Sequence, residues 1–283
     1  MLWICVSVFF KRSPQLQPLS DIPVRTTKDI ADPWFDSMAV LTSGRLVVVD
    51  HDNYAVKLVD IVQYKGLCIL EMEDRPTDVC SLPDNRAAVA LPDMQRILIL
   101  ECDNKLLVVT EIRVQGECTE VAYSNGHLIV LYTDPVKVEI LHINGEVVKQ
   151  NMLEISEILY FDSLSVNSEG NVTSIFVRDD ENRRILRLDE DLQEQQVYRL
   201  PRDNAPWGFP EGAALWSVVA VGENQLLMTD YIARLWQLDT TTGRWTLLNE
   251  DLCCEAEYSM AFCHDRNVLY FGYFCAIKRY AIS

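Results

Sequence analysis

The chain has 283 residues, and 49% of them are hydrophobic, which is enough to bury one large core. Its 11 glycines and 11 prolines are too few for a disordered chain. Acidic residues outnumber basic ones by 42 to 25, so the formal net charge is -17. Such a surface repels phosphate backbones and anionic lipid headgroups, which argues against nucleic-acid and membrane partners and favours a neutral or basic protein or peptide.

The apolar run at residues 1–10 is followed by Lys11 and Arg12. It is about half as long as a membrane span requires. In a signal peptide the positive charge would come before the apolar run, not after it. Residues 1–18 are therefore interpreted as a poorly ordered extension before a single domain of residues 19–283. A secretory signal and a stray segment left by truncation stay open as alternatives.

One pattern recurs from residue 36 onward with a period near 42 residues: an apolar anchor in a short strand, a polar turn and a second strand. Successive anchors lie 41, 42, 43, 54 and 42 residues apart. A third strand alternates between apolar and polar residues, as a half-buried strand does, and a weaker fourth strand follows in the first five units. The anchors are Met38, Val79, Val121, Leu164, Val218 and Met260.

Four strands in a unit of about 40 residues, repeated six times, describe the blades of a propeller. The predicted fold class is all-β: a six-bladed β-propeller with four antiparallel strands per blade. The blades are expected to start near residues 35, 76, 118, 161, 215 and 257. The absence of a helical period between units excludes βαβ folds and helical solenoids.

The two ends of the chain predict how the ring closes. The sixth unit stops at Ser283 after three strands, and a spare strand-like segment, residues 19–27, precedes the first unit. We expect this N-terminal strand to complete the last blade. Pro23 is compatible with this position because proline is tolerated on an edge strand.

The spacing of 54 between the fourth and fifth anchors implies an insertion of about twelve residues, which matches the proline-rich stretch 201–210. A long loop on a scaffold of short turns is often functional. Trp207 and Phe209 are candidate anchors for a partner, although the two rings fit equally well as packing against a neighbouring blade.

The residues just before the anchors lie where the innermost strand of each blade meets the channel mouth. Carboxylates and large rings on one rim would suit a basic peptide, and carboxylates alone would suit a calcium ion. The alternative is that the carboxylates only accept backbone N–H bonds at the start of a strand. The candidate partner-binding residues are Asp36, Asp78, Glu120, Asp162, Trp216 and Tyr258.

Other polar groups are given structural interpretations. Asp50 and Asn53 are expected to bond the turn between two strands, and the acidic stretch 179–182 is expected to be a solvated turn. The four histidines are assigned to different blades. No nucleophile elbow, Walker loop or dinucleotide-binding motif is present, so the chain is not expected to be an enzyme.

The nine cysteines are odd in number and show neither Cys-x-x-Cys nor zinc-site spacing. Neither a metal nor another cofactor is expected. Free thiols in a reducing compartment account for the cysteines, so a cytoplasmic location is predicted.

Residues 43–60, SGRLVVVDHDNYAVKLVD, resemble a unit of the NHL-type propeller, in which the second strand ends in Asp and a short turn carries Asn. The approach to this unit is similar to the start of the NHL-like propellers that end many tripartite-motif proteins. Only the first unit is close, since later units are interpreted as lacking the Asp-x-x-Asn turn. The resemblance implies a target-binding propeller of a tripartite-motif-like ubiquitin ligase system.

Two alternative functions stay open. The first is a calcium-dependent propeller hydrolase of the lactonase or arylesterase type, with Asp78, Glu120 and Asp162 as ligands. The second is an RNA-binding NHL propeller, which predicts a steep salt dependence of binding. The partner's identity and the oligomeric state are not predicted.

Overall fold

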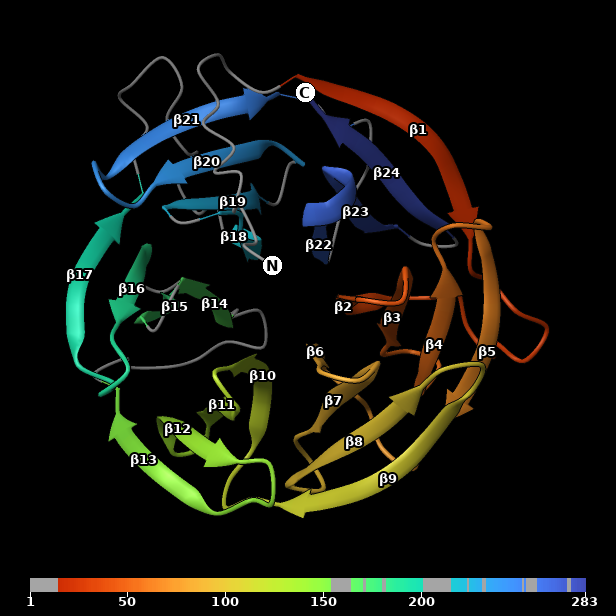
Figure 1. Cartoon of the computed structure of the whole chain (residues 1–283), viewed down its shortest axis with the longest axis horizontal. Helices are drawn as coiled ribbons and strands as arrows, with labels where there is room; N and C mark the ends of the chain where they lie inside the picture. Colours follow the sequence, from red (N-terminus) through yellow and green to blue (C-terminus); the bar gives the residue numbers. More distant parts are fainter. Residues whose placement is uncertain are drawn as a thin grey trace, which may run out of the picture.

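The computed structural model describes residues 15–153, 164–169, 172–179, 182–200, 215–222, 224–230, 233–250, 252, 259–273 and 276–283. Within this part, the strands form six antiparallel sheets of four strands each, arranged as blades around one axis (Figure 1). The predicted six-bladed β-propeller is confirmed. The only helix among the described residues is one short 3-10 turn, η1 (His264–Arg266).

The blades follow one another along the chain, and each runs from an inner to an outer strand. Blade one contains β2 (Phe35–Leu41), β3 (Arg45–Asp50), β4 (Ala55–Asp60) and β5 (Lys65–Glu71). Blade two contains β6 (Asp78–Leu82), β7 (Arg86–Leu91), β8 (Arg96–Cys102) and β9 (Leu106–Arg113). Blade three contains β10 (Cys118–Ser124), β11 (His127–Thr133), β12 (Val136–His142) and β13 (Val147–Met152).

The second half of the ring repeats this order. Blade four contains β14 (Leu164–Glu169), β15 (Val172–Asp179), β16 (Arg184–Leu188) and β17 (Glu194–Arg199). Blade five contains β18 (Leu215–Ala220), β19 (Gln225–Asp230), β20 (Leu235–Asp239) and β21 (Arg244–Asn249). Blade six contains β22 (Met260–Cys263), β23 (Val268–Tyr273) and β24 (Ala276–Ile282), with β1 (Leu16–Pro23) outside β24.

The hydrophobic core is divided among the six interfaces between blades. Each of six buried clusters draws its residues from two neighbouring blades. The period-two pattern of the strands explains this division, because alternate side chains of a strand point to opposite faces of its sheet. In β4, Val56 and Leu58 pack toward blade two, whereas Val59 packs toward blade six. Every blade therefore covers both of its neighbours.

The N-terminal strand closes the ring, as predicted. β1 pairs antiparallel with β24, from Leu16 opposite Ile282 to Pro23 opposite Ala276. It begins at Leu16, before the predicted start at residue 19. Ile22 is fully buried in the cluster between blades six and one. Figure 1 shows β1 as the outermost strand beside β24.

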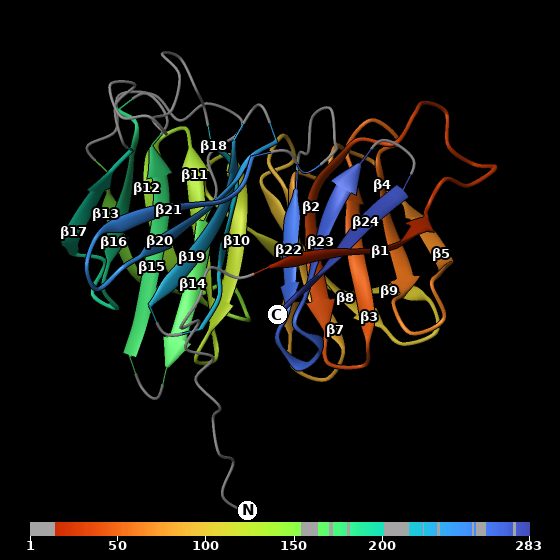
Figure 2. The same cartoon turned by 90° about the horizontal axis from the view of Figure 1, so that it is seen from above.

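The side view defines two faces of the ring. In Figure 2 the innermost strands run from the upper side to the lower side. We call the upper side, where the chain enters each innermost strand, the upper rim. The opposite side, where the first strand turns into the second, is the lower rim. The predicted partner-binding residues before the anchors therefore belong to the upper rim.

Candidate functional site: the upper rim

The innermost strands start with β-bulges in three alternate blades. Register shifts leave one residue unpaired between two paired neighbours at Asp36, Thr119 and Trp216. A bulge bends the strand and re-aims the extra residue. Asp36 and Trp216, two of the predicted site residues, thus occupy equivalent positions. Asp78 and Glu120 stand one position further along, directly before their anchors.

Asp36 forms an ion pair with His51, which lies in the turn between β3 and β4. The distance from Asp36 Oδ2 to His51 Nδ1 is 2.6 Å, and both side chains are about one-quarter exposed. Burial raises the pKa of the Asp36 carboxyl, and the bond to Asp36 raises the pKa of His51. The pair presents its open side on the rim, where a partner carrying a positive charge would compete with His51 for the carboxylate.

Asp78 is buried, with 7% of its surface exposed, and it links three blades. One carboxyl oxygen accepts the hydroxyl of Ser37 in blade one. The other accepts the backbone N–H of Val121 in blade three at 2.7 Å. An innermost strand has no neighbour on its channel side, so a side chain from the preceding blade satisfies this N–H. Ser37 plays the same part for the N–H of Val79, at 3.3 Å.

Glu120 is half-buried, and its side chain is hydrogen-bonded to Asp78. Burial is the main cause that raises the pKa of Asp78, and its bonds to Ser37, Val121, Val79 and Glu120 offset only part of the effect. The side chains of Asp78 and Glu120 thus meet where blades two and three adjoin.

The remaining predicted site residues are only partly placed. Trp216 lies in β18, at the bulge. Four others lie outside the described residues: Asp162, Trp207, Phe209 and Tyr258. Among the residues that the structure describes, no group of three or more His, Cys, Asp or Glu is arranged to hold a metal ion. The calcium-dependent hydrolase stays a prediction.

A buried ionic cluster that the sequence analysis did not predict lies beneath the loop between β1 and β2. Lys57 Nζ lies 2.8 Å from Asp29 Oδ2 and 2.6 Å from Asp50 Oδ2, and all three side chains are at most 2% exposed. We call these three residues the Lys57 cluster. Burial alone would raise the pKa of Asp29, but the bonds from Lys57 and Thr26 outweigh it, so this pKa lies below its ordinary value.

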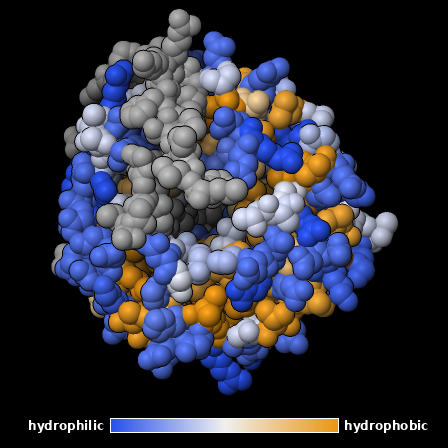
Figure 3. Space-filling model, viewed as in Figure 1, coloured by the Kyte–Doolittle hydropathy of each residue, from blue (hydrophilic) through white to orange (hydrophobic). Residues whose placement is uncertain are grey.

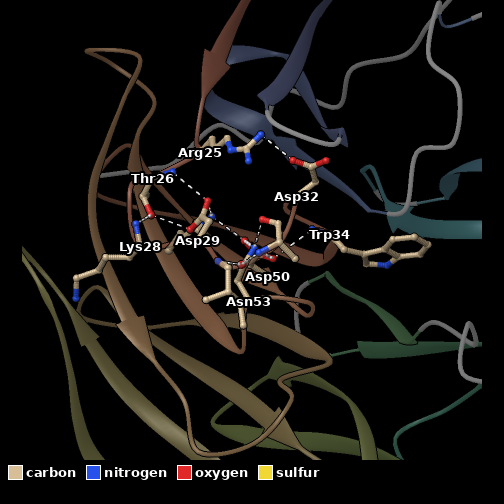
Figure 4. Close-up of polar contacts among 11 residues, drawn as sticks. Arg25, Thr26, Lys28, Asp29, Asp32, Trp34, Asp50 and Asn53 are labelled. Carbon is tan, nitrogen blue, oxygen red and sulfur yellow. Dashed lines mark hydrogen bonds and ion pairs between the residues drawn. The ribbon is translucent and has the colours of Figure 1, made fainter.

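Figure 4 shows Asp29 and Asp50, the two acidic residues of the Lys57 cluster, beside Asn53 and the loop. Asp50 accepts the backbone N–H of Trp34 and the side-chain amide of Asn53. The Asn53 oxygen accepts the backbone N–H groups of Ile30 and Ala31 at 2.7 and 2.9 Å. The predicted role of Asp50 and Asn53 in a turn is confirmed, and it extends to the loop from β1. A lysine at a buried position of the pattern AVKLV was the available signal for this cluster, because a buried charge needs a partner.

Blade four repeats the Asp-x-x-Asn turn, so the interpretation that later units lack it is wrong. Asn182 donates its side-chain amide to both carboxylate oxygens of Asp179, at 3.2 and 3.0 Å, and its backbone N–H to one of them. Arg184 Nε completes the set at 2.6 Å. Asp179 is fully buried, so the expected solvated turn is also wrong at this residue. The buried carboxylate needs these donors because it has left water.

Exposed apolar side chains also lie away from the rim, on the outer strands of blades two and three. They are 41% to 59% exposed, and they make up six of the nine large exposed hydrophobic residues in the described part of the chain. Figure 3 shows separate hydrophobic areas among hydrophilic ones in the lower half of the ring, and Figure 1 shows β9 and β13 end to end along that side. We call this surface the β9–β13 patch: Leu107, Val108, Val109, Val147, Val148 and Met152.

Comparison with known proteins shows the fold and no more. No protein-family profile matches the sequence, and no curated protein matches it. Among solved structures, hydrazine synthase of Kuenenia stuttgartiensis is similar, with a TM-score of 0.63 and 13% identity over 87% of this chain and 76% of that chain. The fold defines the chain as a β-propeller protein. The resemblance to NHL-type propellers stays a prediction. No helix in the described ranges is both long and apolar enough to cross a membrane.

Proposed function

We propose that the chain is a protein-binding propeller without catalytic activity of its own. The β9–β13 patch is the observation that carries the proposal. Six apolar residues on neighbouring outer strands are exposed although the chain has buried hydrophobic clusters at all six blade interfaces. Exposed apolar residues concentrated on two outer strands favour a protein interaction site.

The partner's chemistry follows from the charge. A chain with a formal charge of -17 attracts basic proteins, tolerates neutral ones, and repels nucleic acids and anionic membranes. On the patch, apolar side chains of the partner would be buried against Val108 and Val148. Basic side chains at its margin would meet the acidic surroundings, which speeds encounter more than it adds affinity.

The upper rim is the second candidate surface. Asp36 and Glu120 are half-buried there, and Trp216 is the second residue of β18, at the bulge. Asp78 is already bonded within the scaffold, so its part in partner binding is to hold the position of Glu120. Variants of the two surfaces separate these possibilities.

Quantitative affinity capture from a cell extract tests the proposal. The bait is the full chain, and the patch variant carries Val108→Lys and Val148→Lys. Val62→Lys is the matched control, because Val62 is equally exposed but lies outside the patch. We expect at least one protein to be recovered about tenfold less with the patch variant, the effect of losing one interface hot spot. The control should recover it fully.

A rim variant with Glu120→Gln and Trp216→Ala is tested beside the patch variant. A protein lost with the rim variant alone would move the binding surface to the rim and keep the binding function. If both variants capture every protein as the wild type does, the proposed function fails.

Two finer proposals concern the ubiquitin-ligase context and the cellular location of the chain. The target-binding half of a tripartite-motif-like ubiquitin ligase is supported only by the resemblance at residues 43–60. The cytoplasmic location is supported by the thiols. In the described part of the chain, Cys68, Cys80, Cys102, Cys118 and Cys263 are free. Burial raises the pKa of Cys102 and of Cys118 to about 12, which keeps these two thiols unreactive.

A further inference from the structure

Two histidines face each other on the lower rim of blade three. His127 begins β11 and His142 ends β12, and the two residues are direct cross-strand partners. The assignment of the histidines to different blades is therefore wrong for this pair. Side chains of cross-strand partners lie on the same face of a sheet, with their Cβ atoms about 5 Å apart. The ring centroids are 4.9 Å apart, and the ring planes are tilted by 36°.

The backbone on both sides of the pair is fixed by tight turns. Asn125 and Gly126 have positive φ angles of 48° and 87°, as in a two-residue hairpin turn, and they place His127 directly opposite Ser124. His142 donates its backbone N–H to Glu146 and accepts that of Gly145, both at 2.8 Å. The two imidazoles thus extend from the ends of paired strands, which hold ligand positions better than loops do.

The ring of His127 is also oriented by a hydrogen bond. Its Nδ1 lies 3.0 Å from the backbone oxygen of Asn125. Because a carbonyl oxygen only accepts, this contact assigns the proton to Nδ1 and leaves the lone pair on Nε2 available. Metal-binding histidines are held in this way, with the second ring nitrogen donating to a carbonyl or carboxylate.

We propose that His127 and His142 form a binding site for a divalent transition-metal ion. Neutral imidazoles suit Zn²⁺, Ni²⁺ and Cu²⁺, with Cu²⁺ bound most tightly by such ligands. No third Cys, His, Asp or Glu joins the pair among the described residues, so water completes the coordination and the ion keeps open positions. The acidic net charge raises the local concentration of cations.

Calorimetric titration of the full chain with Zn²⁺ and with Ni²⁺ tests the site. The variants are His127→Gln, His142→Gln and the double substitution, which are mild because both histidines are at least partly exposed. The control is His264→Gln, since His264 packs on Phe262 elsewhere in the ring. Thiols can bind metal in every variant. The titration of the double variant, which lacks both histidines but keeps every cysteine, is therefore subtracted from the other titrations.

We expect the wild type and His264→Gln to bind one additional equivalent relative to the double variant. Each single substitution should weaken this binding at least about tenfold, because either loss leaves a single imidazole. Uptake should also decrease in acid, since protons compete for the ring nitrogens. If the wild type binds no more tightly than the double variant, or if His264→Gln weakens binding as much, the site does not exist. Neither result affects the test of protein binding by the β9–β13 patch or the upper rim.

Discussion

At the scale of single residues, buried charges in this ring join segments that the sequence places far apart. Asp78 joins blades one, two and three, and Lys57 joins blade one to the loop from the closing strand. Each is satisfied by bonds that would be expensive to leave unmade. The contributions of Asp78 and Lys57 to stability can be measured separately.

Asp78→Asn should make stability less dependent on pH. The pKa of folded Asp78 is raised, so the folded chain binds more protons than the unfolded chain between the ordinary carboxyl pKa and the raised one. The free energy of unfolding of the wild type therefore falls as pH rises through this window, by about 1.4 kcal/mol per unit of pKa difference. Asparagine can still accept the Val121 N–H but cannot ionise. Urea unfolding at pH 4 and pH 7 should show the variant gaining relative to the wild type.

The control for Asp78 is Asp84→Asn, because the Asp84 side chain is 85% exposed in a turn of the same blade. Its stability relative to the wild type should be the same at both pH values. A difference between Asp78→Asn and the wild type that does not change with pH would contradict the raised pKa.

Lys57→Met should destabilise the chain by about 3–5 kcal/mol, because it leaves the carboxylates of Asp29 and Asp50 buried without their cation. Lys28→Met is the matched control. Lys28 pairs with Glu71 at the same distance of 2.8 Å, but its side chain is 59% exposed. An exposed pair contributes about 0–1 kcal/mol. Equal losses in urea unfolding for the two variants would show that Lys57 is not part of a buried cluster.

At this scale, a contact between residues close in the sequence could be predicted, and contacts between distant residues could not. The bond between Asp50 and Asn53 spans three residues and was predicted from a turn pattern. The bonds of Asp78 to Ser37 and Val121 span more than 40 residues. The sequence indicates that Asp78 starts a blade, but whether its carboxyl faces the solvent or the next blade depends on the packing of three sheets. Asp36 and Asp78 were predicted at the same rim position, but the bulge at Asp36 places it one position before Asp78 in register.

At the scale of strands, the repeat predicted most of the architecture. Each of the six predicted anchors lies in the innermost strand of a blade. Alternation of apolar residues is a local signal, whereas strand ends depend on ladder bonds to neighbours. The β9–β13 patch was not predicted, because exposed valines in an outer strand have the same local pattern as buried ones.

Ile22→Ala should weaken the closure of the ring. Ile22 is fully buried where β1, β24 and blade one meet, and removing its side chain leaves a cavity at the joint. Truncation of a buried isoleucine costs about 2–5 kcal/mol. Asp21→Ala, one residue earlier on the exposed face of β1, should cost far less. Equilibrium unfolding in urea measures both, and a loss below 1 kcal/mol for Ile22→Ala, on the order of a surface change, would mean that β1 does not close the core.

Arg279 adds a polar part to the same joint. Its guanidinium donates to the backbone and hydroxyl oxygens of Ser20 at 2.6 and 2.7 Å and lies 3.9 Å from the ring centroid of Tyr64 in blade one. Arg279, which lies in β24, thus contacts both β1 and the turn after β4. β1 is therefore held by its hydrogen bonds to β24, by the buried side chain of Ile22 and by Arg279.

At the scale of the whole molecule, the acidic charge opposes the compact ring. The formal charge of -17 repels itself more strongly when the chain is folded, because folding brings the charges together. Raising NaCl from 0.01 to 0.1 M shortens the screening length from about 30 Å to about 10 Å. The urea midpoint should therefore rise with salt. The buried Lys57 cluster is screened little, so it should not reverse the trend. A midpoint that falls with salt would show that surface attractions outweigh the self-repulsion.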